Sequence, residues 1–306
     1  MPEPVMPGYA AIDDGGDVDV APDPGAMTPT RRLGGALGLG FWLSVGWLVA
    51  IATAAVFADA LPFVGDPDSP IRDVARKSGP SLEYPFGVDS NKFDVFARSI
   101  YGARVSLMVG FATILVGFVV GGGLGLLAGY FRGRLETGLV AGADAMLAFP
   151  QLVAALAIVA FLGASVVNLI LALSLLAVPA LFRVTRAATL AMAERDFVTA
   201  ARMVGATHRR ILWREILPNV VPPMLSFGLL AVAIVIVGEG ALAFLGLSVS
   251  APTPSWGALI ERGRDSLGDA AHISLGPAFM MFLTLVALNH VGDRLSRRFD
   301  IREAAM

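Results

Sequence analysis

The sequence has 306 residues, of which 56% are hydrophobic and only 16% are charged, with a formal net charge of −2 and no cysteine. A soluble domain is usually about a quarter charged, so this composition argues against a soluble globular protein. The charges fall in clusters between long uncharged stretches, which is typical of membrane-spanning segments joined by aqueous loops. The absence of cysteine excludes a disulfide, a thiolate metal site and a cysteine nucleophile.

Residues 1–30 are acidic, rich in glycine and proline, and contain no lysine or arginine. Such a segment buries too little apolar surface to offset the entropy lost on ordering. We therefore expect a disordered cytoplasmic tail. It does not have the basic start and early apolar run of a secretory signal.

Six apolar stretches are long enough to cross about 30 Å of hydrocarbon as helices. They cover residues 34–58, 104–130, 138–163, 165–183, 223–247 and 274–292. Between the first two we expect an extracytoplasmic loop, 59–103, and after the last a cytoplasmic tail, 293–306. Basic residues are more numerous in the connections on one side of this arrangement, which predicts a multi-pass protein of the cell membrane with both termini in the cytoplasm.

Glycine recurs at every fourth position of the second stretch, at Gly117, Gly121, Gly125 and Gly129. Small residues at this spacing allow two helix backbones to approach closely in lipid. The pattern predicts a helix-packing face, and the alternative is a run of glycine that is merely tolerated.

The connection 184–222 has the pattern of two short helices. Phe197, Ala200, Ala201 and Val204 recur at the spacing of one helix face, and Gly205 follows them, where a turn needs a positive φ.

Thr207 is a candidate N-cap for a second helix with Ile211, Leu212 and Ile216 on its apolar side, which we expect to end at Leu217-Pro218. Periodicity alone leaves two interpretations open: an amphipathic hairpin on the membrane surface, or a protrusion that fits a groove of a cytoplasmic partner.

The same segment carries a family resemblance. Residues 199–205 read T-A-A-R-M-V-G and residues 216–218 read I-L-P, which resembles the EAA loop of ABC importer permeases. Thr199 stands where this family usually has Glu, so a contact made by that charge must be absent or replaced, with nearby Glu194 as a candidate.

Other segments resemble the C-type permeases of oligopeptide and dipeptide importers. They are I-Y-G-A-R-V-S-L at 100–107, P-F-G at 85–87 with Asp89 and Asp94, L-A-F-P at 147–150 after Asp144, A-F-L-G-L at 243–247 after Glu239, and S-W-G at 255–257. Together the matches cover most of residues 85–260. Lys92 and Phe93 replace an expected Gly-Arg pair, so the outer loop is expected to differ in arrangement or ligand, and Trp256 is expected to anchor at the membrane interface.

The resemblance implies an all-α integral membrane protein with about six transmembrane helices, similar to type I ABC importer permeases. Its core would be residues 104–292, and 184–222 would form a cytoplasmic coupling helix-turn-helix. The residues implied to couple to the ATPase are Glu194, Thr199, Ala200, Ala201, Gly205, Ile216, Leu217 and Pro218.

The same resemblance implies a permease subunit for short peptides that is not itself an enzyme. Its partners would be a second related permease in a heterodimer, two cytoplasmic ATPase subunits that bind ATP and Mg, an extracytoplasmic substrate-binding protein and membrane lipid, with no nucleic acid. The chain itself has no G-x-x-x-x-G-K-[ST] phosphate loop, so no cofactor is expected on it.

Asp144 and Glu239 lie in apolar stretches, where an unpaired charge costs at least a few kcal/mol. They either line the translocation path or its gate, or they accept hydrogen bonds that fix helix packing. A different class, an ion-gradient-driven secondary transporter, would also use such carboxylates but would show internal repeats, and none is evident between the halves. A membrane scaffold whose segment 184–222 docks another partner is the second alternative.

Overall fold

A computed structural model describes residues 38–249 and 252–303, which belong to one compact unit. The predicted acidic tail, 1–30, lies outside the described residues. In the part that the structure describes, the regular structure is helical, and one isolated antiparallel bridge joins Val88 and Asp94.

The helices follow one another in this order. They are α1 (Leu39–Val56), α2 (Val95–Val116), α3 (Gly123–Phe131), α4 (Gly133–Ala148), α5 (Gln151–Leu162), α6 (Val166–Ala193), α7 (Asp196–Met203), α8 (His208–Arg210), α9 (Leu217–Phe244), α10 (Trp256–Gly263) and α11 (His272–Glu303). Short 3-10 turns occupy Ala58–Ala60 and Arg264–Ser266, and π-helical turns occupy Gly117–Gly122 and Ile211–Ile216.

Five continuous helical rods are long and apolar enough to cross a membrane, and the pair α4–α5 makes a sixth if it counts as one span. This agrees with about six predicted spans, but the predicted third span, 138–163, is not one helix. α4 and α5 meet at 80° across Phe149 and Pro150. Proline has no N–H and disfavours the helical conformation of the residue before it, so the helix stops at this point.

Three other predicted boundaries were wrong. The second rod begins at Val95 rather than at 104, because the Asp94 side chain caps it by accepting hydrogen bonds from the N–H groups of Phe96 (2.8 Å) and Ala97 (3.2 Å). The last helix continues through the predicted tail to Glu303. The helix that begins at His208 does not end at Pro218.

The helix passes Pro218 because the proline is in the first turn of α9, where its missing N–H is tolerated. The preceding turn, Ile211–Ile216, widens to π-helical hydrogen bonding, and Asn219 Nδ2 donates to the Glu215 carbonyl at 2.6 Å. One rod therefore runs from His208 to Phe244. The short helix predicted to be separate is continuous with the helix that contains the predicted fifth span.

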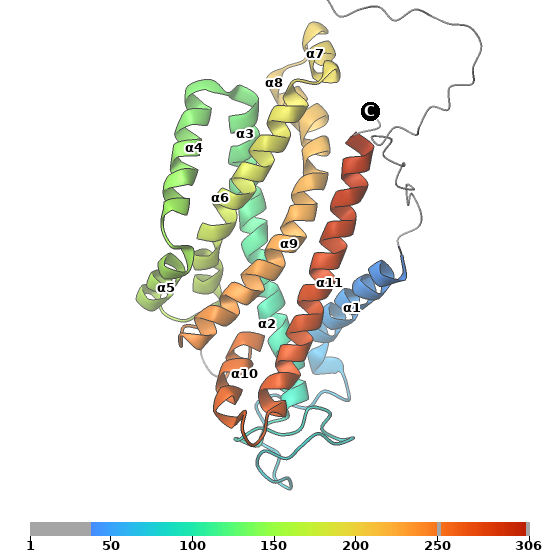
Figure 1. The fold of residues 1–306 in the computed structure, drawn as a ribbon, viewed down its shortest axis with the longest axis vertical. Helices are drawn as coiled ribbons and strands as arrows, with labels where there is room; N and C mark the ends of the chain where they lie inside the picture. The colour runs from blue at the N-terminus through green and yellow to red at the C-terminus, as the bar shows by residue number, and fades with distance from the viewer. Residues whose placement is uncertain (1–37, 250–251, 304–306) are drawn as a thin grey trace, which may run out of the picture. The chain divides into compact units, whose positions relative to one another are not determined.

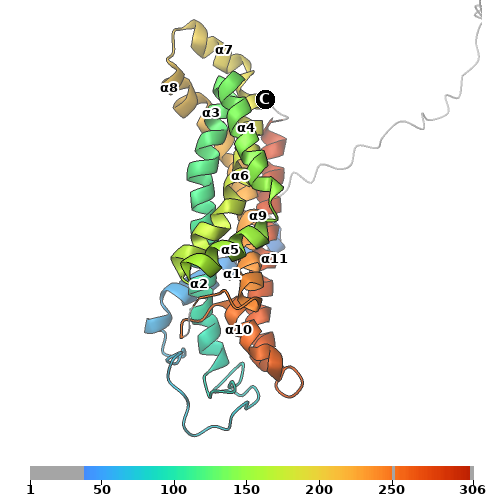
Figure 2. The same ribbon diagram turned by 90° about the vertical axis from the view of Figure 1, so that its left-hand side faces the viewer.

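The main hydrophobic core lies where α2, α6, α9 and α11 meet, and a second cluster lies beside α7. Figures 1 and 2 show α7 and α8 at one end of the bundle, and α10 with the loop 59–94 at the opposite end. We call these the α7 end and the α10 end.

The four glycines spaced by four lie against α6, along α3 and the π-helical turn that precedes it. A Cβ added at Gly121 would overlap the Val178 carbonyl oxygen, and one at Gly125 would lie 2.6 Å from the Phe182 carbonyl oxygen. Added Cβ atoms at Gly117 and Gly129 would meet Leu181 and Thr189. The two helix backbones approach as closely as small-residue packing in membranes allows.

Candidate functional site

The segment 194–218 forms the tip of the α7 end (Figure 1). α7 ends in a turn in which Gly205 has a φ of 78°, and the Thr207 hydroxyl accepts a hydrogen bond from the Arg210 N–H at 3.4 Å. The left-handed turn and the N-cap were both predicted from the sequence, and both are confirmed. A positive φ is costly for any residue with a Cβ, which explains why glycine occupies the turn.

The buried face of α7 is not the predicted one. Val198 is buried and packs with Ile211 and Ile216, while Ala201 is only partly buried. The exposed fraction is 40% for Phe197 and 82% for Val204, both on the predicted apolar face, and 81% for neighbouring Met203. The segment therefore presents apolar side chains to its surroundings at the tip of the bundle.

Three contacts hold this segment to the end of α3. The Tyr130 hydroxyl and His208 Nδ1 are 2.8 Å apart, and the Arg202 guanidinium lies 5.6 Å from the centre of the Tyr130 ring. Arg132 Nη2 and Glu194 Oε1 form an ion pair at 2.6 Å. The Glu194 side chain is 69% exposed and uses only one of its oxygens in this pair, so its second oxygen is available for a contact of the kind that the family's usual Glu would make.

Asp144 lies on the open side of α4, with its side chain 54% exposed, and pairs with Arg183 of α6 at 2.6 Å. The Arg183 side chain is exposed to a similar extent. A hydrophobic pocket lined by Met146, Phe149 and Leu175 lies beside it at the α4–α5 break.

Glu239 lies in the interior of the chain, fully buried. Its Oε1 accepts hydrogen bonds from the hydroxyls of Ser255 (2.7 Å) and Ser248 (3.0 Å), and its Oε2 accepts one from Ser106 (3.3 Å). These donors come from α2, the residues after α9 and the N-cap of α10, so one carboxyl group connects three parts of the fold.

Trp256 completes this network, and its expected position at the membrane interface is wrong. It is fully buried, its indole N–H donates to the Ser99 carbonyl at 3.0 Å, and its backbone N–H donates to the Ser106 hydroxyl at 3.1 Å. Gly257 lies against Gly240 so closely that an added Cβ would be 2.6 Å from the Gly240 Cα. Sequence reasoning missed the three serines as a group, although each lies in or beside a segment that carries the family resemblance.

The described residues include no group of three His, Asp or Glu side chains that could hold a metal ion. Asp144 and Glu194 are paired with arginines, whereas Glu239 is bonded to serine hydroxyls, and such contacts suit helix packing and conformational change. Comparisons with known proteins point in the same direction.

Residues 121–304 match the family described as binding-protein-dependent transport system inner membrane component. The chain belongs to this family. It is 36% identical over 222 residues to the glutathione transport system permease protein GsiD of Pectobacterium atrosepticum, covering 72% of this chain and 74% of that protein. It is 38% identical over 223 residues to GsiD of Escherichia coli O6:K15:H31, with coverage of 73% and 74%.

The permease fold is also similar to that of solved structures. An inward-facing MetNI methionine ABC transporter matches with a TM-score of 0.55 and 18% identity over 66% of this chain and 96% of that chain. A second crystal form of that transporter gives a TM-score of 0.54 and 17% identity, with coverage of 65% and 95%.

The permease is thus a multi-pass membrane subunit of an ABC importer of the peptide-type family and not an enzyme in its own right. This membership excludes the secondary transporter considered above. Permeases of this kind work with ATPase and substrate-binding partners, so the ATP and Mg implied by the family belong to the partners.

Proposed function

We propose that this permease forms half of the translocation path for short peptides or peptide-like solutes and pairs with a second, related permease. The GsiD relatives, whose names include glutathione, support a peptide-like solute. The pairing is supported by large apolar side chains that face outward around the α4–α5 break, including Phe149, Val153 and Phe161. Exposed apolar surface of this extent marks contact with lipid or protein.

The observation that carries the coupling role is the apolar tip of α7. Phe197, Met203 and Val204 are exposed on a segment that projects from the bundle and is fixed at its base by Tyr130 and Arg132. An exposed apolar helix face suits a groove on a partner. In our proposal the segment 194–218 fits into the ATPase subunits, two per importer, and ATP-driven closure of these subunits moves it as a rigid lever.

The orientation follows from the same assignment. The α7 end would be cytoplasmic, and the end of α11 lies beside it (Figure 1). Both termini would then be cytoplasmic, as the distribution of basic residues predicts. The α10 end, with the loop 59–94, would face the extracytoplasmic substrate-binding protein.

The ion pair of Asp144 and Arg183 supports a path along α4 and α6. Both side chains are more than half exposed, yet charged groups at membrane depth almost always face protein or a water-filled cavity rather than lipid. This face therefore borders the second permease or the path itself. Glu239, by contrast, is enclosed by its own chain, which supports a packing role for it.

Charge placed on the α7 tip tests the coupling assignment. Phe197→Asp and Val204→Asp introduce a carboxylate that cannot be buried in an apolar groove without a large desolvation cost. We expect both variants to insert normally but to recover less ATPase in mild detergent and to lose ATP-dependent uptake. The control for ATPase recovery is Leu82→Asp, a fully exposed apolar residue in the loop at the opposite, α10 end. Full ATPase recovery and uptake in both α7 variants would refute the docking role.

A further inference from the structure

A small polar pocket at the α10 end has no role in the proposed coupling. It is lined by the loop residues Asp89, Ser90 and Asn91, by Arg98 of α2, by Arg262 of α10, and by the apolar side chains of Val95, Leu259 and Ile273. Its free volume is about 60 Å³, room for a small polar group, and it is partly open to solvent.

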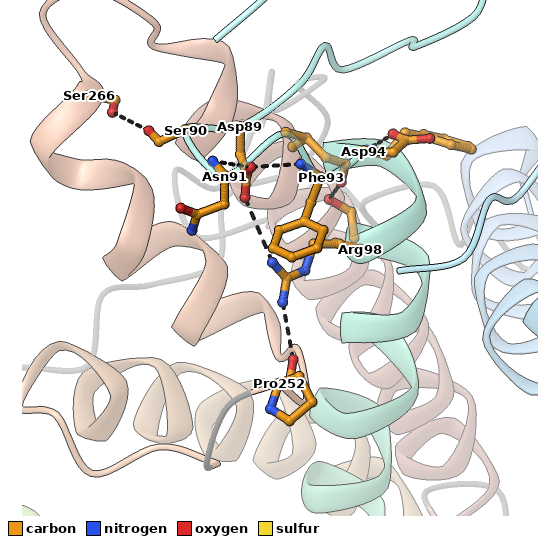
Figure 3. A network of polar contacts seen from close by, with 11 residues as sticks. Asp89, Ser90, Asn91, Phe93, Asp94, Arg98, Pro252 and Ser266 are labelled. Atoms are coloured by element: carbon orange, nitrogen blue, oxygen red, sulfur yellow. Dashed lines mark hydrogen bonds and ion pairs between the residues drawn. The ribbon is translucent and has the colours of Figure 1, made fainter. Parts of the chain in front are cut away.

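Arg98 is the unusual member of this lining, because it is buried and one of its nitrogens, Nε, has no hydrogen-bond partner among the described residues. Its exposed fraction is 4%. A guanidinium has five N–H donors, and here Nη2 donates to the Pro252 carbonyl at 3.1 Å, whereas Nε has no partner among the described residues. Figure 3 shows the guanidinium between Pro252 and Asp89, with the Phe93 ring beside it. An unpaired donor on a buried charged group costs free energy. The pocket therefore has room for a further hydrogen-bond acceptor beside this guanidinium.

Asp89 only partly compensates for this charge. Its Oδ1 accepts hydrogen bonds from the backbone N–H groups of Asn91 and Phe93, both at 2.8 Å. Its Oδ2 is 3.7 Å from Arg98 Nη1, within range of an ion pair but too far for a good hydrogen bond. Most of the hydrogen-bonding capacity of Asp89 therefore shapes the loop.

Arg262 adds a second guanidinium to the pocket, and its side chain has no ion pair or hydrogen bond with the described residues. The charged lining is then two arginines and one aspartate, an excess of one positive charge. The Ser90 hydroxyl, 3.4 Å from that of Ser266, and the unpaired Asn91 amide add neutral polar groups.

The loop is held in this shape by local backbone geometry. Lys92 has a φ of 68°, in the left-handed region that favours glycine, and the Arg98 guanidinium lies 4.4 Å from the centre of the Phe93 ring. The family pattern has Gly-Arg at these two positions. In this chain Lys92 takes the left-handed turn, and Phe93 places an aromatic face on Arg98.

We propose that this pocket binds a carboxylate group through Arg98 and Arg262, with its apolar floor against the adjoining carbon atoms. A single planar negative charge matches the fork geometry of a guanidinium and the net charge of the lining. Asp89 would repel a doubly charged phosphate more strongly than a singly charged carboxylate. The carboxylate comes either from the free terminus of a small solute or from an acidic side chain of an extracytoplasmic protein. These two sources rest on the proposed function, whereas carboxylate binding by the two arginines does not.

The test uses the full-length permease in lipid nanodiscs and three peptide probes, measured by ligand-observed NMR. The probes are tri-alanine with a free carboxylate, tri-alanine amide, and N-acetyl-Ala-Asp-Ala-amide, whose only carboxylate is on a side chain. Binding of either acidic probe, without binding of tri-alanine amide, is the expected result. Preference for free tri-alanine indicates a solute terminus, and preference for the aspartyl probe indicates an acidic protein partner.

The variant Arg262→Gln, at an exposed position, is expected to weaken acidic-probe binding about tenfold or more, as loss of one charge-assisted contact predicts. Arg264→Gln is the matched control, since Arg264 lies close in sequence but outside the pocket lining and pairs with Asp265. Equal binding of tri-alanine amide, no binding of any probe, or unchanged binding in Arg262→Gln would overturn the proposal. The assay needs no ATPase, so it can fail or succeed independently of the transport function.

Discussion

The buried carboxyl group of Glu239 offers the sharpest test of how this fold is held together. The three hydroxyls of Ser106, Ser248 and Ser255 all donate to it. Replacement by alanine removes their common acceptor and leaves a cavity, whereas replacement by glutamine keeps the shape and one of the two oxygens.

The expected costs follow from counting orphaned donors. A buried donor without a partner costs about 1–3 kcal/mol. In Glu239→Ala, Ser248 and Ser255 can bond to one another because their oxygens are 3.2 Å apart, which leaves about two orphans and a cavity. We expect a loss of about 3–6 kcal/mol in the free energy of unfolding. Glu239→Gln orphans only the Ser106 hydroxyl or its equivalent, for about 1–3 kcal/mol.

Trp256 provides a local signal for this measurement, because it is fully buried and donates to the Ser99 carbonyl beside the network. The purified chain in detergent micelles would be unfolded with increasing SDS and followed by tryptophan fluorescence and by circular dichroism. Trp256→Phe would identify the part of the fluorescence change that comes from this residue.

The control is Glu215→Ala, a carboxylate near the start of the same helical rod whose side chain forms no hydrogen bond or ion pair with the described residues. It should change stability by no more than about 0.5 kcal/mol. The reasoning fails if Glu239→Ala lowers the free energy of unfolding no more than this control does, or if Glu239→Gln lowers it as much as Glu239→Ala.

Three further predictions concern the helices and their ends. Gly121→Ala should destabilise the chain by about 1–3 kcal/mol in SDS unfolding, because its Cβ would overlap the Val178 carbonyl. Gly123→Ala, with open space at its Cβ, should be neutral or stabilising. Equal effects of the two variants would contradict the close packing of Gly121 against α6. Burial raises the pKa of the Asp94 carboxyl above its usual value near 3.8. Its protonated form therefore stabilises the fold below the unfolded pKa, and this stabilisation is lost as pH rises through the folded pKa. Asp94→Asn keeps the cap and should flatten the pH dependence of stability between pH 3 and 7, whereas an unchanged profile would exclude Asp94 as its source. Gly205→Val should reduce ATP-dependent uptake, because a β-branched residue at a φ of 78° costs more than about 1–2 kcal/mol. Gly205→Asn should retain uptake, because asparagine tolerates this conformation. Equal uptake in both variants would show that the turn is not strained during coupling.

The apolar stretches located the membrane helices but not their ends. The second rod begins before its predicted start because Asp94 caps it. Arg98, in its first turns, was not predicted to be buried, because Pro252, one of the residues that cover it, is 154 positions away in sequence.

The α7 segment shows the same limit on a smaller scale. Its turn and N-cap were predictable, because Gly205 and Thr207 act through their own backbone and near neighbours. Its buried face was not, because several faces of a short alanine-rich helix are apolar enough to pack. The rod that contains Ile211 and Ile216 selects the face with Val198.

The sequence by itself determined the class of protein, the approximate set of membrane helices, the close-packing glycines and the motifs of an importer permease, since all of these depend on composition or short-range spacing. It could not distinguish Asp144 from Glu239, two carboxylates in similarly apolar stretches. Tertiary structure decided that Asp144 pairs with Arg183 on an open face while Glu239 is enclosed. The reason is physical: the groups that solvate a buried carboxyl here come from Ser106 and Ser255, which only the folded chain brings to it.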